Sequence, residues 1–196
     1  MTASSIVGWV LLGVVFFWGI GAYNRLVRLR AAVGKAFAAL DQLLLQQLVW
    51  VQGCLPESMR GGLQTTPGEL QDAATAAWAR LAAASEQFTL ALAQARLQPT
   101  ESASIEALYL AQTAWHIAWH EALAEEGPIS AMQPPAERML AKWNRLQHQE
   151  QPLVVAFNEA VDQHNRAVAQ FPASLLARMW GYRPAGRLPT PNKSGR

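Results

Sequence analysis

The chain begins with an uncharged segment whose apolar run, Ile6 to Ala22, continues for seventeen residues without a polar side chain. A helix that crosses a bilayer needs about 20 apolar residues, with a lower limit near 17. The small residues 3–5 before the run bring the segment to this length. Trp9 and Trp18 lie near its two ends and Tyr23 follows it, as aromatic residues do at membrane interfaces. The pattern therefore predicts a transmembrane helix over residues 6–22.

Two other interpretations fit a leading apolar run. A cleavable signal peptide usually carries Lys or Arg in its first residues and small residues at its cleavage site. Here the first five residues, MTASS, are uncharged, although Ala22 provides a small residue at which cleavage is conceivable. A buried core helix would need the remaining helices wrapped around it. The interfacial aromatic residues and the uncharged start favour a retained anchor.

Basic residues after the apolar run predict the orientation of this anchor. Lys and Arg near a membrane span prefer the cytoplasmic side. Four of them precede the first acid of the chain, Asp41: Arg25, Arg28, Arg30 and Lys35. We therefore expect a single-pass protein of the inner cell membrane, with its N-terminus outside and the bulk of the chain in the cytoplasm. The single cysteine, Cys54, permits no intramolecular disulfide, which suits a reducing compartment.

Beyond the anchor, apolar residues recur at spacings of three and four, which predicts amphipathic helices. The first continues out of the membrane and ends near Gly53, because Gly is a common helix stop and Pro56 follows it. The Gly- and Pro-containing residues that come next are a predicted loop. Thr66-Pro67 then supplies a helix cap and a first helical position for a second helix, which Pro99 ends.

A third helix is predicted from Thr100 to Gly127, and a fourth from Pro134 to Pro172. Pro152 lies inside the fourth pattern and is expected to kink or split it, because it lacks a backbone donor and crowds the preceding turn. No segment alternates with period two over a useful length, so no strand is predicted. Short loops imply antiparallel neighbours. The predicted fold is all-α, with an N-terminal transmembrane helix that continues into an antiparallel bundle of about four long helices.

The chain accordingly divides into five predicted segments. These are a short extracytoplasmic N-terminus (1–5), the transmembrane helix (6–22), a cytoplasmic helical bundle (23–171), a short amphipathic segment (172–184) and a basic disordered tail (185–196).

Charge is distributed in three parts along the chain, although its net value is only +2. All fourteen acids lie between Asp41 and Asp162, and with six bases they give residues 36–165 a net charge of −8. The residues before this middle part carry +4 and those after it carry +6. In an antiparallel bundle both basic ends meet at the bilayer, where anionic lipid attracts basic segments.

The amphipathic segment is a predicted second membrane contact. It places apolar side chains on one helical face and two arginines within reach of lipid phosphates, as in helices that lie in the headgroup plane. The candidate interface residues are Leu175, Leu176, Arg178, Met179, Trp180 and Arg183. The alternative is that Leu176 and Trp180 close the end of the bundle core.

Two stretches of the chain resemble a known family. YNRLVRLRAAVGKAFAALDQLL (23–44) resembles the opening of LemA-family proteins, in which a YNxLV segment leads into a long helix after a single anchor. FNEAVDQHNRAVAQFPASLLARMWGYRP (157–184) resembles the closing pattern of that family. The resemblance covers about 50 residues. It implies an all-α, membrane-anchored protein without an established enzymatic activity, in a family that includes a relative associated with membrane shaping.

Three asparagines lie within these two stretches. Asn24 and Asn158 belong to the patterns YNRLV and FNEAV, on two helices that would lie antiparallel at the same end of the bundle. Asn165 follows Asn158 by seven residues and projects from nearly the same face. A polar residue in a helical seam can fix the register of the helices. We expect this register role for the three asparagines, with a binding role as the alternative.

Candidate chemistry is sparse. His116 and His120 are one helical turn apart, but Glu121 follows them, whereas zinc enzymes of the HExxH type need a glutamate between the histidines. We therefore expect two polar residues beside an apolar stripe, and no metal. His164 and Glu150 lie on the stripe of the fourth helix and could form hydrogen bonds with neighbouring helices. No Gly-rich phosphate loop or nucleophile motif is present.

These patterns predict a membrane-anchored scaffold or membrane-organising protein with no catalytic activity and no cofactor. The expected partners are the lipid bilayer and a second protein or a second copy of the chain. Nucleic acid is not expected, because aromatic stacking residues are not interleaved with the basic ends. The alternative is an adaptor or sensor whose bundle binds a partner enzyme. A metal-dependent hydrolase is a weaker third alternative.

Overall fold

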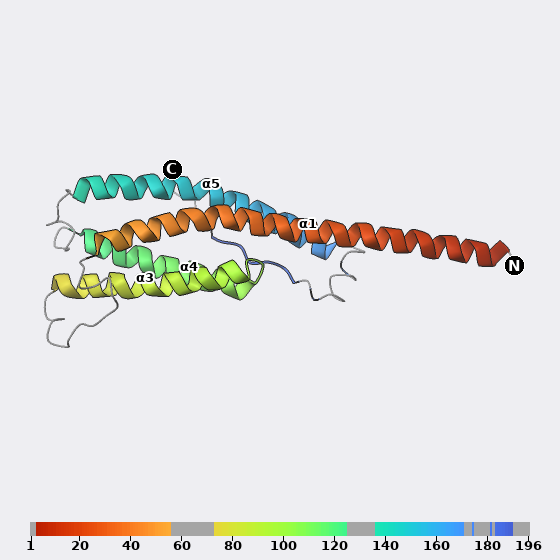
Figure 1. Ribbon diagram of the computed structural model, residues 1–196, viewed down its shortest axis with the longest axis horizontal. Coiled ribbons are helices and arrows are strands. Elements are labelled where there is room, and N and C mark those ends of the chain that lie inside the picture. Colours follow the sequence, from red (N-terminus) through yellow and green to blue (C-terminus); the bar gives the residue numbers. More distant parts are fainter. Residues whose placement is uncertain are drawn as a thin grey trace.

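The computed structural model of the protein describes residues 3–55, 73–124, 136–170, 174, 181 and 183–189. These described residues form four helices (Figure 1), which are α1 (Ala3–Cys54), α3 (Ala73–Leu97), α4 (Ser102–Leu123) and α5 (Ala136–Ala169). No strand occurs in the described residues. The predicted all-α fold, with an apolar N-terminal helix that continues into a bundle, is therefore confirmed.

Helix α1 is the longest element and has 52 residues. At about 1.5 Å per residue it is roughly 78 Å long. Its first part projects from the molecule and its second part packs in the bundle (Figure 1). Leu26 is the first buried residue among the side chains that the structure describes, and from Val33 buried positions recur every three or four residues as far as Val51. The helix ends at Cys54, in agreement with the predicted end near Gly53.

The four helices are arranged as two pairs. Helix α1 packs against α5, α3 packs against α4, and α1 also contacts α3. A short turn joins α3 to α4, in which the backbone N–H of Glu101 donates to the carbonyl of Gln98 at 3.0 Å. This tight turn makes α3 and α4 antiparallel, as the short predicted loop implies.

An aromatic cluster forms the centre of the core. Trp115 of α4 stacks on Phe88 of α3, with ring centroids 4.9 Å apart, and meets the edge of Trp143 of α5 at 5.4 Å. Trp50 of α1 joins Trp119 and Trp143 at 5.2 and 6.4 Å. Aromatic side chains bury large areas and gain further from such geometries. All four described helices therefore meet at one set of rings.

Helix α5 continues without interruption through Pro152. The alternative in which Pro152 splits the predicted helix is therefore wrong. Proline costs the helix one hydrogen bond, but Pro152 is exposed, whereas Leu146 and Phe157 are buried on either side of it. On both sides of the proline, rings of α5 contact rings of α1, Trp143 with Trp50 and Phe157 with Phe37. This packing favours one continuous helix. The predicted helix ends at Thr66, Gly127 and Pro134 lie outside the described residues.

Candidate functional site

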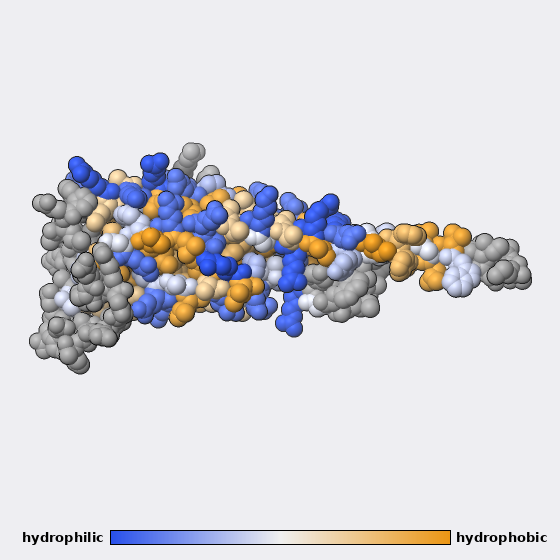
Figure 2. Space-filling model, viewed as in Figure 1, coloured by the Kyte–Doolittle hydropathy of each residue, from blue (hydrophilic) through white to orange (hydrophobic). Residues whose placement is uncertain are grey.

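The projecting part of α1 carries apolar side chains that no described residue covers. Ten of them, between Trp9 and Ile20, are 42–75% exposed. Figure 2 shows these apolar residues along the projection, with hydrophilic residues where it joins the bundle. Among the described residues, one helix, within Gly8–Cys54, is long and apolar enough to cross a membrane, a test that a signal sequence also passes. The exposure shows that this segment is not a core helix of the bundle.

The end of α5 lies where the projection meets the bundle. Leu26 of α1 packs against Ala167 and Val168 of α5. Beside them, a guanidinium nitrogen of Arg25 donates to the side-chain oxygen of Gln170 at 3.5 Å. The C-terminal part of the chain that carries +6, which starts at Arg166, therefore begins beside the first basic residues after the apolar run.

Most of the predicted membrane-interface residues lie outside the described residues, namely Leu175, Leu176, Arg178, Met179 and Trp180. Their contact with lipid remains a prediction. Arg183 is described and exposed. Together with Arg30, Glu101 and His164 it lines a cavity of about 310 Å³ beside the turn that joins α3 to α4.

Two of the three predicted asparagines bind the backbone of residues 183–189, an extended segment that we call the C-terminal strap. Asn158 donates to the carbonyl of Leu188 at 2.7 Å and accepts from its N–H at 2.9 Å. Asn165 forms the same pair of bonds with Ala185, at 3.0 and 2.7 Å. Asn24 is exposed on α1. Asn158 and Asn165 therefore both bind the strap, and the side-chain oxygen of Asn165 also lies 3.4 Å from Nδ1 of His164. The register role stays a prediction.

The strap also packs its apolar side chains against the bundle. Ala185 and Leu188 are each 5% exposed, and Arg187 forms an ion pair with Asp162 at 3.4 Å. The prediction of a disordered tail from residue 185 is therefore wrong for residues 185–189. The reason is that two side-chain amides replace the partners that an extended backbone normally finds in a sheet. Residues 190–196 lie outside the described residues.

Gly186 allows the strap to approach α4 closely. A Cβ atom at this position would lie 2.8 Å from the Cα of Ser102, a backbone atom that cannot move aside. We expect Gly186→Ala to displace the strap, because overpacking of this kind costs about 1–3 kcal/mol. The amide protons of Ala185 and Leu188 should then exchange with solvent about tenfold faster in an NMR hydrogen-exchange experiment. Arg187→Ala, which removes only a half-exposed ion pair, is the control, and equal exchange rates in both variants would contradict this role of Gly186.

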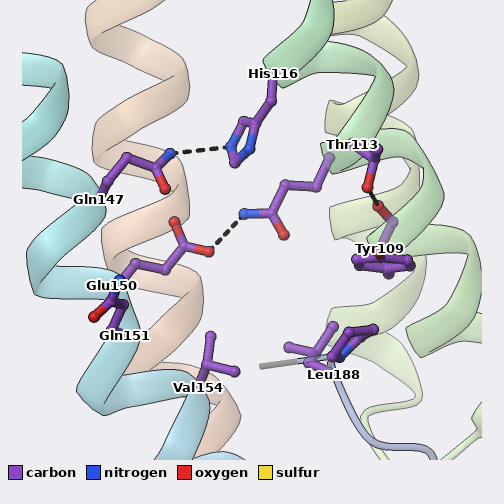
Figure 3. Close-up of a pocket in the computed structure, with 10 residues that line it drawn as sticks. Tyr109, Thr113, His116, Gln147, Glu150, Gln151, Val154 and Leu188 are labelled. Atoms are coloured by element: carbon purple, nitrogen blue, oxygen red, sulfur yellow. Dashed lines mark hydrogen bonds between the residues drawn. The ribbon is translucent and has the colours of Figure 1, made fainter. Parts of the chain in front are cut away.

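A buried polar cluster joins three helices beside the strap. The carboxylate of Glu150 on α5 accepts a hydrogen bond from Gln47 of α1 at 2.9 Å and another from Gln112 of α4 at 2.7 Å. The predicted hydrogen bonding of Glu150 to neighbouring helices is therefore confirmed. Glu150 lines a cavity of about 490 Å³ between α4 and α5, and Leu188 of the strap closes one end of it (Figure 3).

His116 lies on the α4 side of this cavity. The side-chain amide of Gln147 donates to its Nε2 at 3.1 Å, which places the imidazole proton on Nδ1 (Figure 3). Burial, with a smaller contribution from the charge of His120, lowers the pKa of His116 to about 4. His120 itself is exposed. In the described part of the chain, no group of three or more His, Cys, Asp or Glu side chains could hold a metal ion.

Sequence reasoning missed the cavity and the strap. The signal for the cavity was a carboxylate on the apolar stripe of a helix, since such a group must find donors on the helices that cover it. The strap carries no comparable signal, because its composition of Pro, Gly and Arg is typical of a disordered tail.

The fold and these sites define an all-α protein, with four helices in the part of the chain that the structure describes, whose apolar N-terminal helix extends beyond its bundle. Comparison with known proteins finds no matching family model, no matching curated protein and no matching solved structure. The resemblance to LemA proteins therefore depends on the two sequence stretches alone.

Proposed function

We propose that this protein is a single-pass, membrane-anchored helical scaffold or membrane-organising protein of the LemA type, with its bundle in the cytoplasm. The observation that carries the proposal is the row of exposed apolar side chains on the projecting part of α1, followed directly by exposed basic residues. Exposure of such a row to water carries a free-energy cost in proportion to its apolar area, and contact with bilayer hydrocarbon removes this cost. The arginines that follow retain the bulk of the chain on the cytoplasmic side.

The continuity of α1 supports a structural role for the bundle. One helix spans both the projecting segment and the packed segment, so no flexible linker separates the anchor from the bundle. From Leu26 to Cys54 the helix rises roughly 43 Å at about 1.5 Å per residue. The bundle therefore stands at a defined distance and orientation from the bilayer, as a scaffold requires.

A partner-binding role is the second candidate, and exposed apolar residues on the α3–α4 pair favour it. Leu90 and Leu97 are seven residues apart on α3 and are 71% and 77% exposed. Leu110 and Ile117 have the same spacing on α4 and are 60% and 56% exposed. Residues seven apart share a helical face, so each helix offers a short apolar row to a partner helix.

Reconstitution distinguishes the two roles. A scaffold reconstituted into phosphatidylcholine–phosphatidylglycerol vesicles should self-associate in cross-linking gels or change vesicle shape in electron micrographs. An adaptor should leave the vesicles unchanged and capture one stoichiometric partner when cross-linked in native membranes.

The orientation is tested with single cysteines in intact cells. In a Cys54→Ser background, a cysteine that replaces Thr2 should react with a membrane-impermeant maleimide. One that replaces Arg196 should react only after permeabilisation. Labelling of the second variant in intact cells would refute the proposed topology.

Substitution of apolar residues in the projecting segment by arginine is expected to release the protein from vesicles. Each arginine at the centre of a membrane helix costs about 2.5–3.5 kcal/mol on insertion scales. The double variant Val14→Arg/Phe17→Arg should therefore stay at the bottom of a flotation gradient, whereas the wild-type chain floats. The matched control is Val49→Arg/Leu90→Arg, because these two side chains are as exposed but lie in the bundle. Flotation of the first variant, or sedimentation of the control, would argue against the anchor.

A further inference from the structure

The cavity between α4 and α5 contains a buried carboxylate that no described basic residue neutralises. Glu150 is 9% exposed, and the three ion pairs among the described residues do not include it. Both of its carboxylate oxygens accept from uncharged glutamine amides. None of the ten described residues that line the cavity is Lys or Arg. The cavity wall therefore carries negative charge without a cation.

Such an arrangement is unusual for a structural carboxylate. Ionised side chains are rarely buried unless a charge of opposite sign accompanies them, because removal from water is costly. Two amide donors offset part of this cost. A ligand cation in the adjoining cavity would supply the missing charge. The volume of about 490 Å³ lies in the range of small-molecule sites.

The remaining walls indicate the kind of cation. Apolar surface comes from the ring of Tyr109 and the side chains of Val154 and Leu188, on three different segments. Hydroxyl and amide groups of Thr113 and Gln151 lie among the polar lining. A ligand that matches these walls has a positively charged group with N–H donors and a short hydrocarbon stem. A calcium or magnesium ion fits less well, because it needs six or more oxygen ligands and the lining has one carboxylate. A zinc ion fits less well too, because it needs at least three protein ligands and the described residues hold no group of three His, Cys, Asp or Glu side chains that could bind it.

We propose that this cavity binds a small organic ammonium ion, a primary amine on a short hydrocarbon stem, with its charge against Glu150. The amine is a soluble molecule and not a lipid headgroup. Gln47, which contacts Glu150, lies 21 residues beyond Leu26 along α1. At about 1.5 Å per residue this places the carboxylate roughly 30 Å from the bundle end nearest the apolar projection, beyond the reach of a headgroup.

Glu150→Gln is the variant that tests the proposal, because it removes the charge and keeps the shape. It is expected to fold. Gln47 has a buried side-chain oxygen without a hydrogen-bond partner in the described residues. After rotation of its amide, this oxygen can accept from the new amide at position 150. Glu159→Gln, on the exposed face of the same helix, is the matched control.

The experiment is isothermal titration of the full chain in nanodiscs with n-butylammonium. The wild type and Glu159→Gln should bind it saturably, and Glu150→Gln at least tenfold more weakly. The neutral analogue n-butanol should bind the wild type no better than n-butylammonium binds Glu150→Gln. Phosphatidylethanolamine in the nanodisc should not compete. The proposal would be overturned if the wild type bound n-butylammonium without saturation, if Glu150→Gln and Glu159→Gln bound it equally well, or if the wild type bound n-butanol as tightly as n-butylammonium. Competition by phosphatidylethanolamine would overturn the assignment to a soluble amine.

A second measurement covers the case in which the variant is unstable. In the wild-type chain, the ¹³C shift of the Glu150 side-chain carboxyl should move on addition of n-butylammonium, while that of Glu159 stays in place. An unchanged Glu150 shift at concentrations that saturate any calorimetric signal would place the ligand elsewhere.

Discussion

Replacement of Trp115 by alanine is expected to lower the free energy of unfolding of the bundle by about 3–5 kcal/mol. The side chain is completely buried, stacks on Phe88 at 4.9 Å and meets the edge of Trp143 at 5.4 Å. Its indole N–H also donates to the hydroxyl of Ser85 at 3.0 Å. The variant therefore loses buried area, two ring contacts and a hydrogen bond, and leaves a cavity where all four helices meet. A loss of this size should lower the melting temperature by about 10 °C in a chain of this length.

A pair of phenylalanine variants separates the hydrogen bond from the packing. Trp119 is as buried as Trp115, but its indole nitrogen has no hydrogen-bond partner in the described residues. Trp119→Phe should therefore be less destabilising than Trp115→Phe by about 1–2 kcal/mol, since only the latter loses a hydrogen bond. Thermal unfolding followed by circular dichroism in detergent measures both. Equal losses of the free energy of unfolding in Trp115→Phe and Trp119→Phe would show that the hydrogen bond from Trp115 to Ser85 contributes nothing to stability.

Acidification is expected to destabilise the bundle through His116. Its pKa is lowered to about 4 in the folded protein, whereas an unfolded histidine titrates near 6.5. Between these values the unfolded chain binds a proton that the folded chain excludes, so stability falls as the pH falls through this window. From pH 7 to pH 5 the loss from this residue is about 2 kcal/mol. Protonation at Nε2 would also set two donors against each other, because Gln147 already donates to that nitrogen.

Two variants test the assignment to His116. Burial also lowers the pKa of His164, so part of the pH dependence will persist in any single variant. Denaturant unfolding at pH 7 and pH 5 measures the free energy of unfolding at each pH. Between these values it should fall by about 2 kcal/mol less in His116→Gln than in the wild type. His120→Gln should retain most of it, because that side chain is exposed. The same pH dependence in wild type and His116→Gln would contradict the assignment.

The helical content of the fold and the ends of its helices were largely predictable from sequence. An apolar run that ends at Ala22 is followed by an amphipathic stripe that begins at Leu26, and this pattern predicts one continuous helix over both segments. Helix α1 is such a helix. Glycine and proline signals near Gly53 and Pro99 end helices where the structure ends them. These features are local, because helix formation and helix ends depend on residues within a few positions of each other.

The candidate sites were predictable only in part. The position of Glu150 on an apolar stripe indicated hydrogen bonds to neighbouring helices, but not that Gln47 and Gln112 would be the donors. Asn158 and Asn165 were singled out by their spacing, yet their observed partner is a backbone 20–30 residues away. A side-chain amide binds whichever polar group the fold brings to it, so its partner cannot be read from its own neighbourhood.

The sequence by itself determined that the chain is helical and where the helices end near Gly53 and Pro99. It also determined that the apolar part of the first helix begins well before the amphipathic stripe that packs in the bundle. Only the tertiary structure decided that α1 pairs with α5, that residues 185–189 bind along the bundle, and that a buried carboxylate borders a cavity. The physical reason is the range of the interactions. Helix formation depends on neighbours three or four residues apart, whereas a pairing, a strap and a cavity each depend on surfaces that meet only when the whole chain has packed.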